Sequence, residues 1–366
     1  MEKVVLVYPH KKNLSARQRE DGLLEMSELV RSAGGNVVAS YDVPIDSPSP
    51  AHYIREGKLE AIRGDVESKS ATVLILGVDL SATQARNIEE FCGARVVDRT
   101  GLILDIFARR ATSSEGKLQV ELAQLQYLLP RLAGQGVIMS RLGGGIGTRG
   151  PGEQKLEVDR RKIRDRIARL KQDLDKLRVH RALLRQGRKR RNFFVATLVG
   201  YTNAGKSTLM NQLTGAGVHV EDKLFATLDP RTRLVKGTRV GDILFTDTVG
   251  FLINLPHGLI ESFKATLEEI KDSDLILHVL DVSHPNYAEH YRVTESVLKD
   301  LECEANDRLI VLNKTDLLPS AEFKSRIFER FPTAHFVSAK GGDGVEELKS
   351  TIIQIFEKKR VAQNAD

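Results

Sequence analysis

The segment Gly200–Ser207 constrains the fold of this chain more than any other part of the sequence. It follows a largely apolar stretch, residues 193–199, that reads as a strand, and residues 208–213 continue it as a helix. A glycine, four variable residues and then Gly-Lys-Ser in this context form the pattern of a phosphate-binding loop, or P-loop. Backbone N–H groups of such a loop and of the helix that follows face phosphate oxygens. We therefore expect phosphate contacts from Gly200, Tyr201, Thr202, Asn203, Ala204, Gly205, Lys206, Ser207 and Thr208.

Three further segments occur in the order that a guanine-nucleotide domain requires, each at the end of a strand-like run. They are Asp247-Thr248-Val249-Gly250, Asn313-Lys314-Thr315-Asp316 and Ser338-Ala339-Lys340. Ligands of open α/β sheets bind at the carboxyl ends of strands, so these segments are expected to meet the P-loop. The Asp316 carboxylate can accept hydrogen bonds from the ring N–H and the exocyclic amine of guanine, and adenine offers neither donor on that edge. The four segments together predict a GTP-binding, GTP-hydrolysing domain.

Chemical roles follow from the residue types. Lys206 is expected to reach the β- and γ-phosphates, and the N–H of Gly250 to sense the γ-phosphate. The Ser207 hydroxyl and the Asp247 carboxylate are expected at a Mg²⁺ ion. Thr227 is the candidate switch threonine, preferred on the family resemblance given below, and is expected to close over the same ion, so Lys206, Thr227 and Gly250 form the predicted catalytic set.

Thr227 belongs to a segment between the P-loop and Asp247 that is expected to contact nucleotide. The predicted contacts there come from Phe225, Ala226, Thr227, Leu228 and Asp229. Thr232 is the rival for the switch threonine. Arg231 and Arg233 could stabilise phosphate charge or simply be surface residues.

Phe251 and Leu252 follow Gly250, where many small G proteins carry a glutamine that orients the attacking water. An apolar side chain cannot orient a water molecule. Intrinsic hydrolysis is therefore predicted to be slow, and a partner to supply the missing polar groups, an effect that can reach about 10⁵-fold in the Ras system.

Residues 1–112 alternate strand-like and helix-like stretches, which predicts a small parallel α/β domain. A helix is expected from Ser15 to Ala33, ended by two glycines, and Ser81 is expected to cap a later one. No glycine fingerprint for phosphate lies in this region. Whether it holds a second nucleotide site stays open.

Residues 113–191 read as an antiparallel helical hairpin. Leucines recur at helical spacing from Leu118 to Leu132, and Ile or Leu residues from Ile163 to Leu177. Between these two seams lies a stretch, 141–152, too rich in glycine for a helix or strand. The expected RNA-contacting residues are Arg141, Arg149, Arg188, Lys189, Arg190 and Arg191. Residues 192–366 are then the P-loop domain with a mostly parallel sheet.

Charge is concentrated in that middle region. The net charge of the chain is +6, yet residues 141–191 alone hold 18 Lys or Arg against 6 Asp or Glu. Such a local excess favours a polyanion such as RNA over a merely solvated helix face. Aromatic residues are only 5%, which argues against binding by extensive base stacking. Two distant cysteines, Cys92 and Cys303, the lack of a signal peptide and the lack of a long apolar run predict a cytoplasmic protein without a membrane span.

The chain resembles the HflX family of ribosome-associated GTPases. The resemblance rests on residues 200–209, Phe225–Asp229, Asp247–Phe251, the glycine-rich run 143–153, and on 97–100 with 102–108. It implies an N-terminal domain of that family, a helical linker and a translation-factor-type G domain. It also implies binding to the large ribosomal subunit and its rRNA, stimulated hydrolysis with Mg²⁺, and a role in splitting, rescue or assembly of ribosomes, by a protein expected to be a monomer. Only a short tail follows the last expected helix, 345–359, so the extra C-terminal domain of longer members is not expected here.

An alternative from another class is an RNA-binding or remodelling protein in which nucleotide is mainly a structural ligand. The motifs do not decide between the two, because both bind GTP and RNA. Turnover with naked RNA and with intact ribosomal subunits would separate them.

Overall fold

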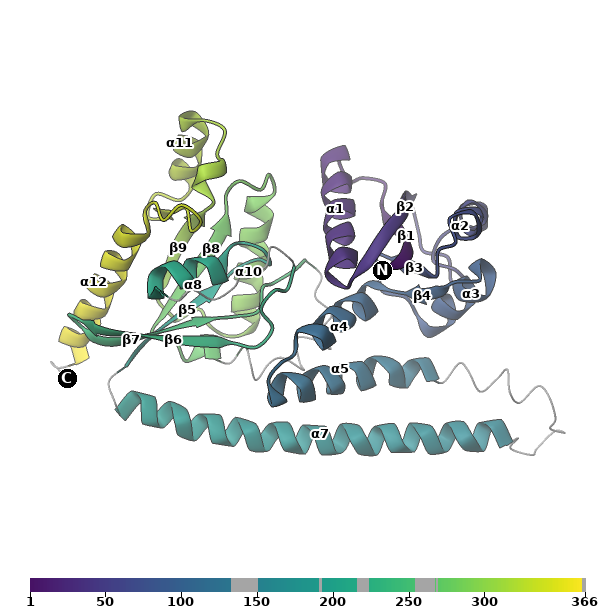
Figure 1. Ribbon diagram of the computed structural model, residues 1–366, viewed down its shortest axis with the longest axis horizontal. Coiled ribbons are helices and arrows are strands. Elements are labelled where there is room, and N and C mark those ends of the chain that lie inside the picture. The colour runs from purple at the N-terminus through teal and green to yellow at the C-terminus, as the bar shows by residue number, and fades with distance from the viewer. Residues whose placement is uncertain (133–150, 191–192, 216–223, 254–266, 268, 364–366) are drawn as a thin grey trace. The chain divides into compact units, whose positions relative to one another are not determined.

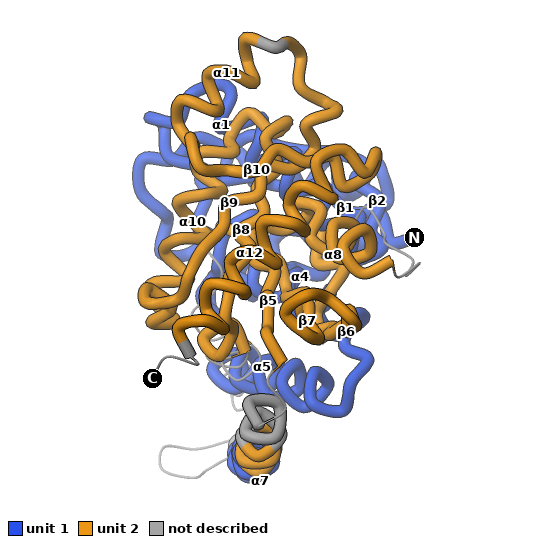
Figure 2. The backbone as a smooth tube through the Cα atoms, turned by 90° about the vertical axis from the view of Figure 1, so that its left-hand side faces the viewer, with its two compact units in different colours: residues 1–175 blue, residues 176–366 orange. Residues whose placement is uncertain are grey.

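The computed structural model of the protein describes residues 1–132, 151–190, 193–215, 224–253, 267 and 269–363 (Figure 1). The chain divides into two compact units, residues 1–175 and residues 176–366, coloured separately in Figure 2. Within the described ranges, no helix combines the length and the apolar character needed to cross a bilayer.

Unit 1 contains a four-stranded sheet in the order β2-β1-β3-β4 whose strands are all parallel. The strands are β1 (Glu2–Lys11), β2 (Gly35–Ile45), β3 (Val73–Leu76) and β4 (Arg95–Val97). The helices are α1 (Ala16–Ser32), α2 (Glu56–Ser68), α3 (Ala82–Cys92), α4 (Arg99–Arg110), α5 (Ser114–Leu132) and α7 (Pro151–Arg190), of which α7 continues into unit 2. The small parallel α/β domain predicted from the sequence is confirmed.

Local chemistry explains the ends of two of these helices. The Ser15 side chain accepts the Gln18 N–H, and the Gln18 side chain accepts the Ser15 N–H, so a reciprocal capping box starts α1. Ser81 and Gln84 do the same for α3, as the sequence predicted for Ser81. Gly93, in the left-handed conformation at φ +67°, ends α3.

The core of unit 1 forms where alternate apolar residues of β1 and β3 face the apolar sides of α2 and α3. Val5 and Val7 on β1 and Leu74 and Leu76 on β3 are fully or nearly fully buried, and they pack in one cluster with apolar residues of α2 and α3. Helices α1 and α4 contact each other and sheet strands outside that cluster. Burial of such side chains contributes about 1.5–3 kcal/mol each.

Helices α5 and α7 run alongside each other in opposite directions within unit 1 (Figure 1), as the hairpin expectation required. Arg166 of α7 donates through Nε and one terminal nitrogen to the two carboxylate oxygens of Glu121 on α5, at 2.7 and 2.8 Å. On α7, Leu170 is fully buried. On α5, Val120 and Ala123 are buried, and α5 also contacts α3 and α4. Helix α5 therefore packs both against α7 in the hairpin and against helices of the sheet domain, and its leucine spacing alone did not indicate the second contact.

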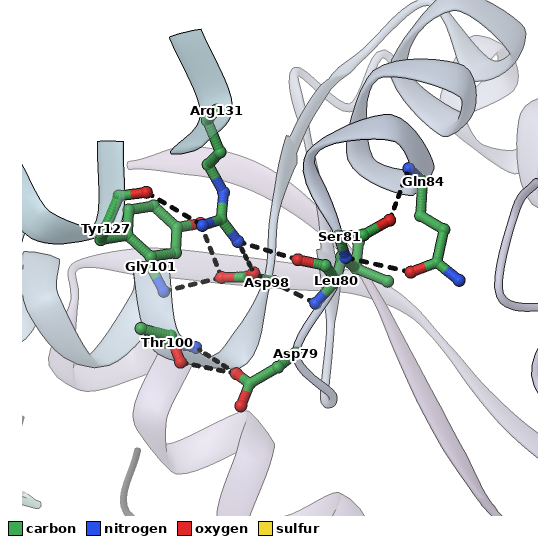
Figure 3. Close-up of polar contacts among 9 residues, drawn as sticks. All are labelled: Asp79, Leu80, Ser81, Gln84, Asp98, Thr100, Gly101, Tyr127 and Arg131. Atoms are coloured by element: carbon green, nitrogen blue, oxygen red, sulfur yellow. Dashed lines mark hydrogen bonds and ion pairs between the residues drawn. The ribbon is translucent and has the colours of Figure 1, made fainter. Parts of the chain in front are cut away.

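A buried carboxylate fastens the end of α5 to the sheet domain (Figure 3). Asp98, which follows β4 and caps α4, accepts hydrogen bonds from the Gly101 N–H at 2.8 Å and the Tyr127 hydroxyl at 2.7 Å on Oδ1. Its Oδ2 accepts from the Leu80 N–H at 3.2 Å and from Arg131 at 2.6 Å. The Arg131 guanidinium also lies 3.5 Å from the centre of the Tyr127 ring. Four donors thus satisfy one carboxylate that is 2% exposed.

Unit 2 contains a six-stranded sheet in the order β10-β9-β8-β5-β7-β6, parallel except for the antiparallel edge strand β6. The strands are β5 (Phe194–Val199), β6 (Arg231–Thr238), β7 (Gly241–Asp247), β8 (Leu275–Asp281), β9 (Arg308–Asn313) and β10 (His335–Phe336). The helices with assigned bounds are α8 (Lys206–Thr214), α10 (Tyr287–Asp300), the 3₁₀ turn η1 (Thr315–Leu317), α11 (Ala321–Arg330) and α12 (Val345–Gln363). The mostly parallel sheet predicted here is confirmed.

Helices cover both faces of this sheet. Helices α8 and α12 pack on one face through residues such as Leu209 and Phe356, in a cluster with Phe194 and Phe245 of the strands. A second cluster includes Ile327 and residues of β8 and β9. Because both faces are covered, β5 and β8 are almost continuously apolar, and polar groups collect in the loops beyond their carboxyl ends.

Candidate nucleotide site

The P-loop connects the end of β5 to the start of α8, as its sequence context predicted. Two of its glycines are required by close packing. A Cβ on Gly200 would lie 2.1 Å from the carbonyl oxygen of Val279, and one on Gly205 would lie 2.2 Å from Nδ2 of Asn313. Gly205 also has φ +90°, which side chains rarely adopt. The loop therefore lies directly against β8 and against the Asn313 side chain.

Lys206 begins α8 and is 6% exposed. Its Nζ donates to the carbonyl oxygens of Gly200 at 3.1 Å and of Tyr201 at 2.9 Å. Burial lowers the pKa of Lys206 to about 8, and the nearby Asp247 carboxylate opposes that shift. An ammonium held at this position has lost much of its hydration, so an anionic phosphate would be a strongly favoured neighbour.

Two hydroxyls and one carboxylate meet beside Lys206. Ser207 Oγ donates to Asp247 Oδ2 at 2.5 Å, Thr227 Oγ1 donates to the same oxygen at 3.1 Å, and the two hydroxyl oxygens are 2.9 Å apart. The other oxygen, Asp247 Oδ1, is buried without a hydrogen-bond partner in the described structure. Burial raises the pKa of Asp247, opposed chiefly by Lys206. The two hydroxyls meet at Oδ2, and hydroxyl and carboxylate oxygens are the ligands that a hard cation such as Mg²⁺ takes.

The segments after β9 and β10 form a second polar group. Asn313 donates from Nδ2 to the Ala204 carbonyl at 2.8 Å and accepts the Ala339 N–H on Oδ1 at 2.9 Å, so it joins the P-loop to the 338–340 segment. The Ser338 hydroxyl donates to Asp316 Oδ1 at 2.6 Å. Lys314, at φ +61°, forms an ion pair with Asp281 at 2.8 Å. The Ser338 hydroxyl thus restrains the Asp316 carboxylate, which the sequence analysis predicts to select the base.

A pocket of about 450 Å³ lies between these groups. Most of the sequence-predicted residues line it: Thr202, Asn203, Gly205, Lys206, Ser207, Thr208, Phe225, Ala226, Thr227, Thr248, Gly250, Asn313, Lys314, Asp316, Ala339 and Lys340. The remaining predicted residues do not line it: Gly200, Tyr201, Ala204, Leu228, Asp229, Asp247, Val249, Thr315 and Ser338. Some of these residues instead contact residues that line the pocket: Asp247 bonds with Ser207 and Thr227, and Ser338 bonds with Asp316. Leu317 lines the pocket and was not predicted, although its place one residue after Asp316 could have indicated it.

The two candidate switch threonines lie in different surroundings. Thr227 is 8% exposed and contacts Ser207 and Asp247. Thr232 lies in β6, where its hydroxyl is 3.1 Å from that of Thr246. Arg231 and Arg233 are exposed on the same edge strand. Thr227, and not Thr232, therefore contacts the Ser207 and Asp247 oxygens that are predicted to bind the cation.

The predicted RNA contacts cannot be placed. Arg141, Arg149 and Arg191 lie outside the described residues, and for Arg188, Lys189 and Arg190 the structure describes only the helical backbone at the end of α7. They stay predictions.

Models of three protein families match consecutive parts of the chain. "GTP-binding GTPase N-terminal" matches residues 20–108, "GTP-binding GTPase Middle Region" matches 110–188, and "50S ribosome-binding GTPase" matches 195–314.

Curated relatives match over most of their length. The protein named GTPase HflX of Caldanaerobacter subterraneus subsp. tengcongensis is 49% identical over 343 residues, 93% of this chain and 78% of the relative. GTPase HflX of Lacrimispora saccharolytica is 45% identical over 98% of this chain and 84% of the relative, and that of Escherichia coli is 43% identical over 90% and 77%.

Two solved structures share the fold across nearly the whole chain. One, described as SsGBP in complex with GDP, is 26% identical with a TM-score of 0.55, over 98% of this chain and 99% of that one. The other, a GTP-binding protein from the archaeon Sulfolobus solfataricus in complex with GDP, is 24% identical with a TM-score of 0.51 and the same coverage.

Proposed function

This chain belongs to the HflX family of GTPases, and on that premise we propose that its hydrolysis of GTP is stimulated by the large ribosomal subunit. The relatives and the domain match confirm the prediction of a GTP-hydrolysing enzyme. The ribosomal partner is supported by the description "50S ribosome-binding GTPase" for the family that matches residues 195–314. The observation that carries the proposal is the buried Phe251 beside the residues predicted to bind phosphate and cation, at the place where a polar side chain would orient water.

Ser207, Thr227 and Asp247 would hold Mg²⁺, and the ion would neutralise charge on the β- and γ-phosphates. The unpartnered Asp247 Oδ1 and the two converging hydroxyls support this assignment. The chain's own residues do the rest of the positioning. Lys206 would bind the phosphates, the Gly250 N–H would contact the γ-phosphate, and Asp316 would select guanine.

The surroundings of Phe251 support the proposal that a partner stimulates hydrolysis. Its side chain is 1% exposed, its N–H donates to the Gly200 carbonyl at 3.1 Å, and its carbonyl accepts the Thr202 N–H at 2.8 Å. A buried phenyl ring offers no group to orient a water molecule, and the neighbouring Leu252 is buried as well. We therefore propose that the ribosome supplies or repositions the polar groups that hydrolysis requires.

Three domains would divide the work: the hairpin 113–191 would contact rRNA, the G domain 192–366 would switch with nucleotide, and residues 1–112 would form an interaction or positioning domain. The basic excess of residues 141–191 supports the RNA contact, through Arg141, Arg149 and the cluster Arg188–Arg191. A monomeric cytoplasmic factor that splits, rescues or assembles ribosomes would use such a division.

The experiment is GTP turnover by the purified chain with and without large ribosomal subunits, at moderate salt. We expect strong stimulation by the subunits, and its loss with intact intrinsic turnover in Arg141→Ala/Arg149→Ala. No stimulation, with GTP binding intact, would contradict the ribosomal role. Equal stimulation by naked rRNA would instead favour an RNA-binding or remodelling protein.

A further inference from the structure

Thr202, the third residue of the P-loop, contacts the segments on both sides of the proposed nucleotide site. Its N–H donates to the Phe251 carbonyl at 2.8 Å, and its hydroxyl oxygen accepts the Phe225 N–H at 2.9 Å. Phe225 begins the predicted switch segment that ends at Asp229, and Phe251 follows Gly250 in the other. One P-loop residue, 5% exposed, thus holds both segments at once.

The contact with Phe225 restrains an unfavourable backbone. Phe225 has φ +55°, a left-handed conformation that a bulky residue rarely adopts and that costs about 1–2 kcal/mol in ordinary chains. Its ring is 1% exposed, so ring burial and the Thr202 hydroxyl oppose that cost together. Without the hydroxyl, a buried N–H would lose this acceptor and the segment would open more readily.

The second segment is packed as closely. A Cβ added to Gly250 would lie 2.5 Å from Cα of Thr202, so the backbones of the two residues are in contact. Phe225, Ala226 and Thr227 line the pocket that Gly250 also lines. Movement of the first segment away from the pocket would break the Thr202–Phe225 hydrogen bond.

We propose that Thr202 is a positioning residue that latches the Phe225–Thr227 segment over the nucleotide and sets the rate of nucleotide exchange. This inference deepens the proposed function, on whose nucleotide site it rests, and it is independent of the ribosome. Because entry and release use the same opening, loss of the latch accelerates both, and the affinity changes less than either rate. A hydroxyl that merely contacted phosphate would alter release and leave entry unchanged.

The test is the association and dissociation rates of fluorescent mant-GDP with the full chain in Mg²⁺, without ribosomes. Thr202→Val keeps the shape and removes the hydroxyl, and we expect both rates to rise about fivefold, the effect of one net hydrogen bond. Thr202→Ser keeps the hydroxyl and should restore slow exchange. Thr232→Val removes a hydroxyl contact within the β6–β7 pair, outside the site, and should leave both rates unchanged.

Faster dissociation with unchanged association in Thr202→Val would overturn the latch, as would unchanged rates. Absence of mant-GDP binding by the unmodified chain would overturn the site itself, a different failure. If Thr202→Val did not fold, hydrogen exchange of residues 224–228 would be compared between Thr202→Ala and the unmodified chain. Faster exchange at the Phe225 amide supports the latch, and equal exchange contradicts it.

Discussion

In each unit a buried aspartate lies at, or directly after, the carboxyl end of a strand, and the surroundings of the two aspartates differ. Asp98, after β4 in unit 1, receives four hydrogen bonds from protein donors, among them the Arg131 guanidinium (Figure 3). Asp247, at the end of β7 in unit 2, receives two hydroxyls on one oxygen, and its other oxygen is buried without a hydrogen-bond partner in the described structure. The two aspartates occupy similar positions in their sheets. The Asp98 carboxylate has hydrogen-bond donors on both oxygens, whereas the Asp247 carboxylate has them on one.

The difference separates a structural carboxylate from the one that we propose binds a cation. A buried charge that the protein satisfies fully stabilises the place where its donors meet, here the junction of α5 with the sheet domain. A buried charge left partly unsatisfied costs stability, which is tolerated where a cation or substrate completes it. The number of hydrogen bonds that the protein donates to each carboxylate, more than the burial of the carboxylate, therefore distinguishes the two sites.

The largest expected effect comes from Asp98→Asn. The amide keeps the size of the carboxylate, but it removes the charge opposite Arg131 and turns an NH₂ group toward N–H or O–H donors. Breaking a buried ion pair costs about 3 kcal/mol or more. Peptide-level hydrogen exchange should show that much loss of protection in α4 and α5, with β5 and β7 unchanged and GDP affinity retained. Undiminished protection in α5 would contradict the structural role of Asp98.

Asp247→Asn should give the opposite result. We expect GDP affinity in Mg²⁺ to fall roughly 100-fold, because a charged cation ligand is lost. Protection of β7 should be unchanged or higher, because an unsatisfied buried charge is removed. The measurement is GDP titration with Mg²⁺ and with EDTA. The difference in GDP affinity between the variant and the unmodified chain should disappear in EDTA. A difference that persisted in EDTA would argue against a cation at Asp247.

Buried histidines extend the comparison to pH. In unit 1, His10 lies 2.6 Å from the Asp42 carboxylate, whereas in unit 2 His290 stacks on Tyr201 at 3.7 Å between ring centres and tilts against His284. Burial, followed by the charge of His284, lowers the pKa of His290 to about 3, and burial also lowers the pKa of His278. The unfolded chain therefore binds protons that the folded one does not between about pH 6.5 and 3, so stability falls as the pH drops through that window.

From pH 7 to pH 5 the expected loss from His290 alone is about 2 kcal/mol. Hydrogen exchange at the two pH values, corrected for intrinsic rates, should show it in β5, β8 and α10 more than in β1. His290→Phe should reduce the pH dependence in unit 2. An identical pH dependence in that variant would show that another group titrates.

Most of the nucleotide site could be predicted because its chemistry is local in sequence. Residues such as Lys206 and Asp316 stand in short motifs directly after apolar strands, and the strand ends bring the motifs together. The sheet domain was predictable from alternating strands and capped helices, as at Ser81.

What could not be predicted depends on long-range partners. Asp98 meets Tyr127 and Arg131 across about 30 residues of sequence, with no motif to mark the contact. The antiparallel strand β6 was read only as part of the segment near Thr232, because an exposed edge strand has little apolar alternation. The hydrogen bond between Thr202 and Phe225 depends on a left-handed residue that composition does not reveal.

The most direct test of the central claim, that this pocket binds a guanine nucleotide, is base selection by Asp316. A carboxylate accepts two N–H groups of guanine, whereas Asp316→Asn presents an amide donor that suits the carbonyl of xanthine at the same edge. We predict that GDP affinity falls roughly 100-fold or more and that XDP becomes the preferred ligand. Unchanged preference for GDP over XDP in the variant would contradict the assignment of the pocket.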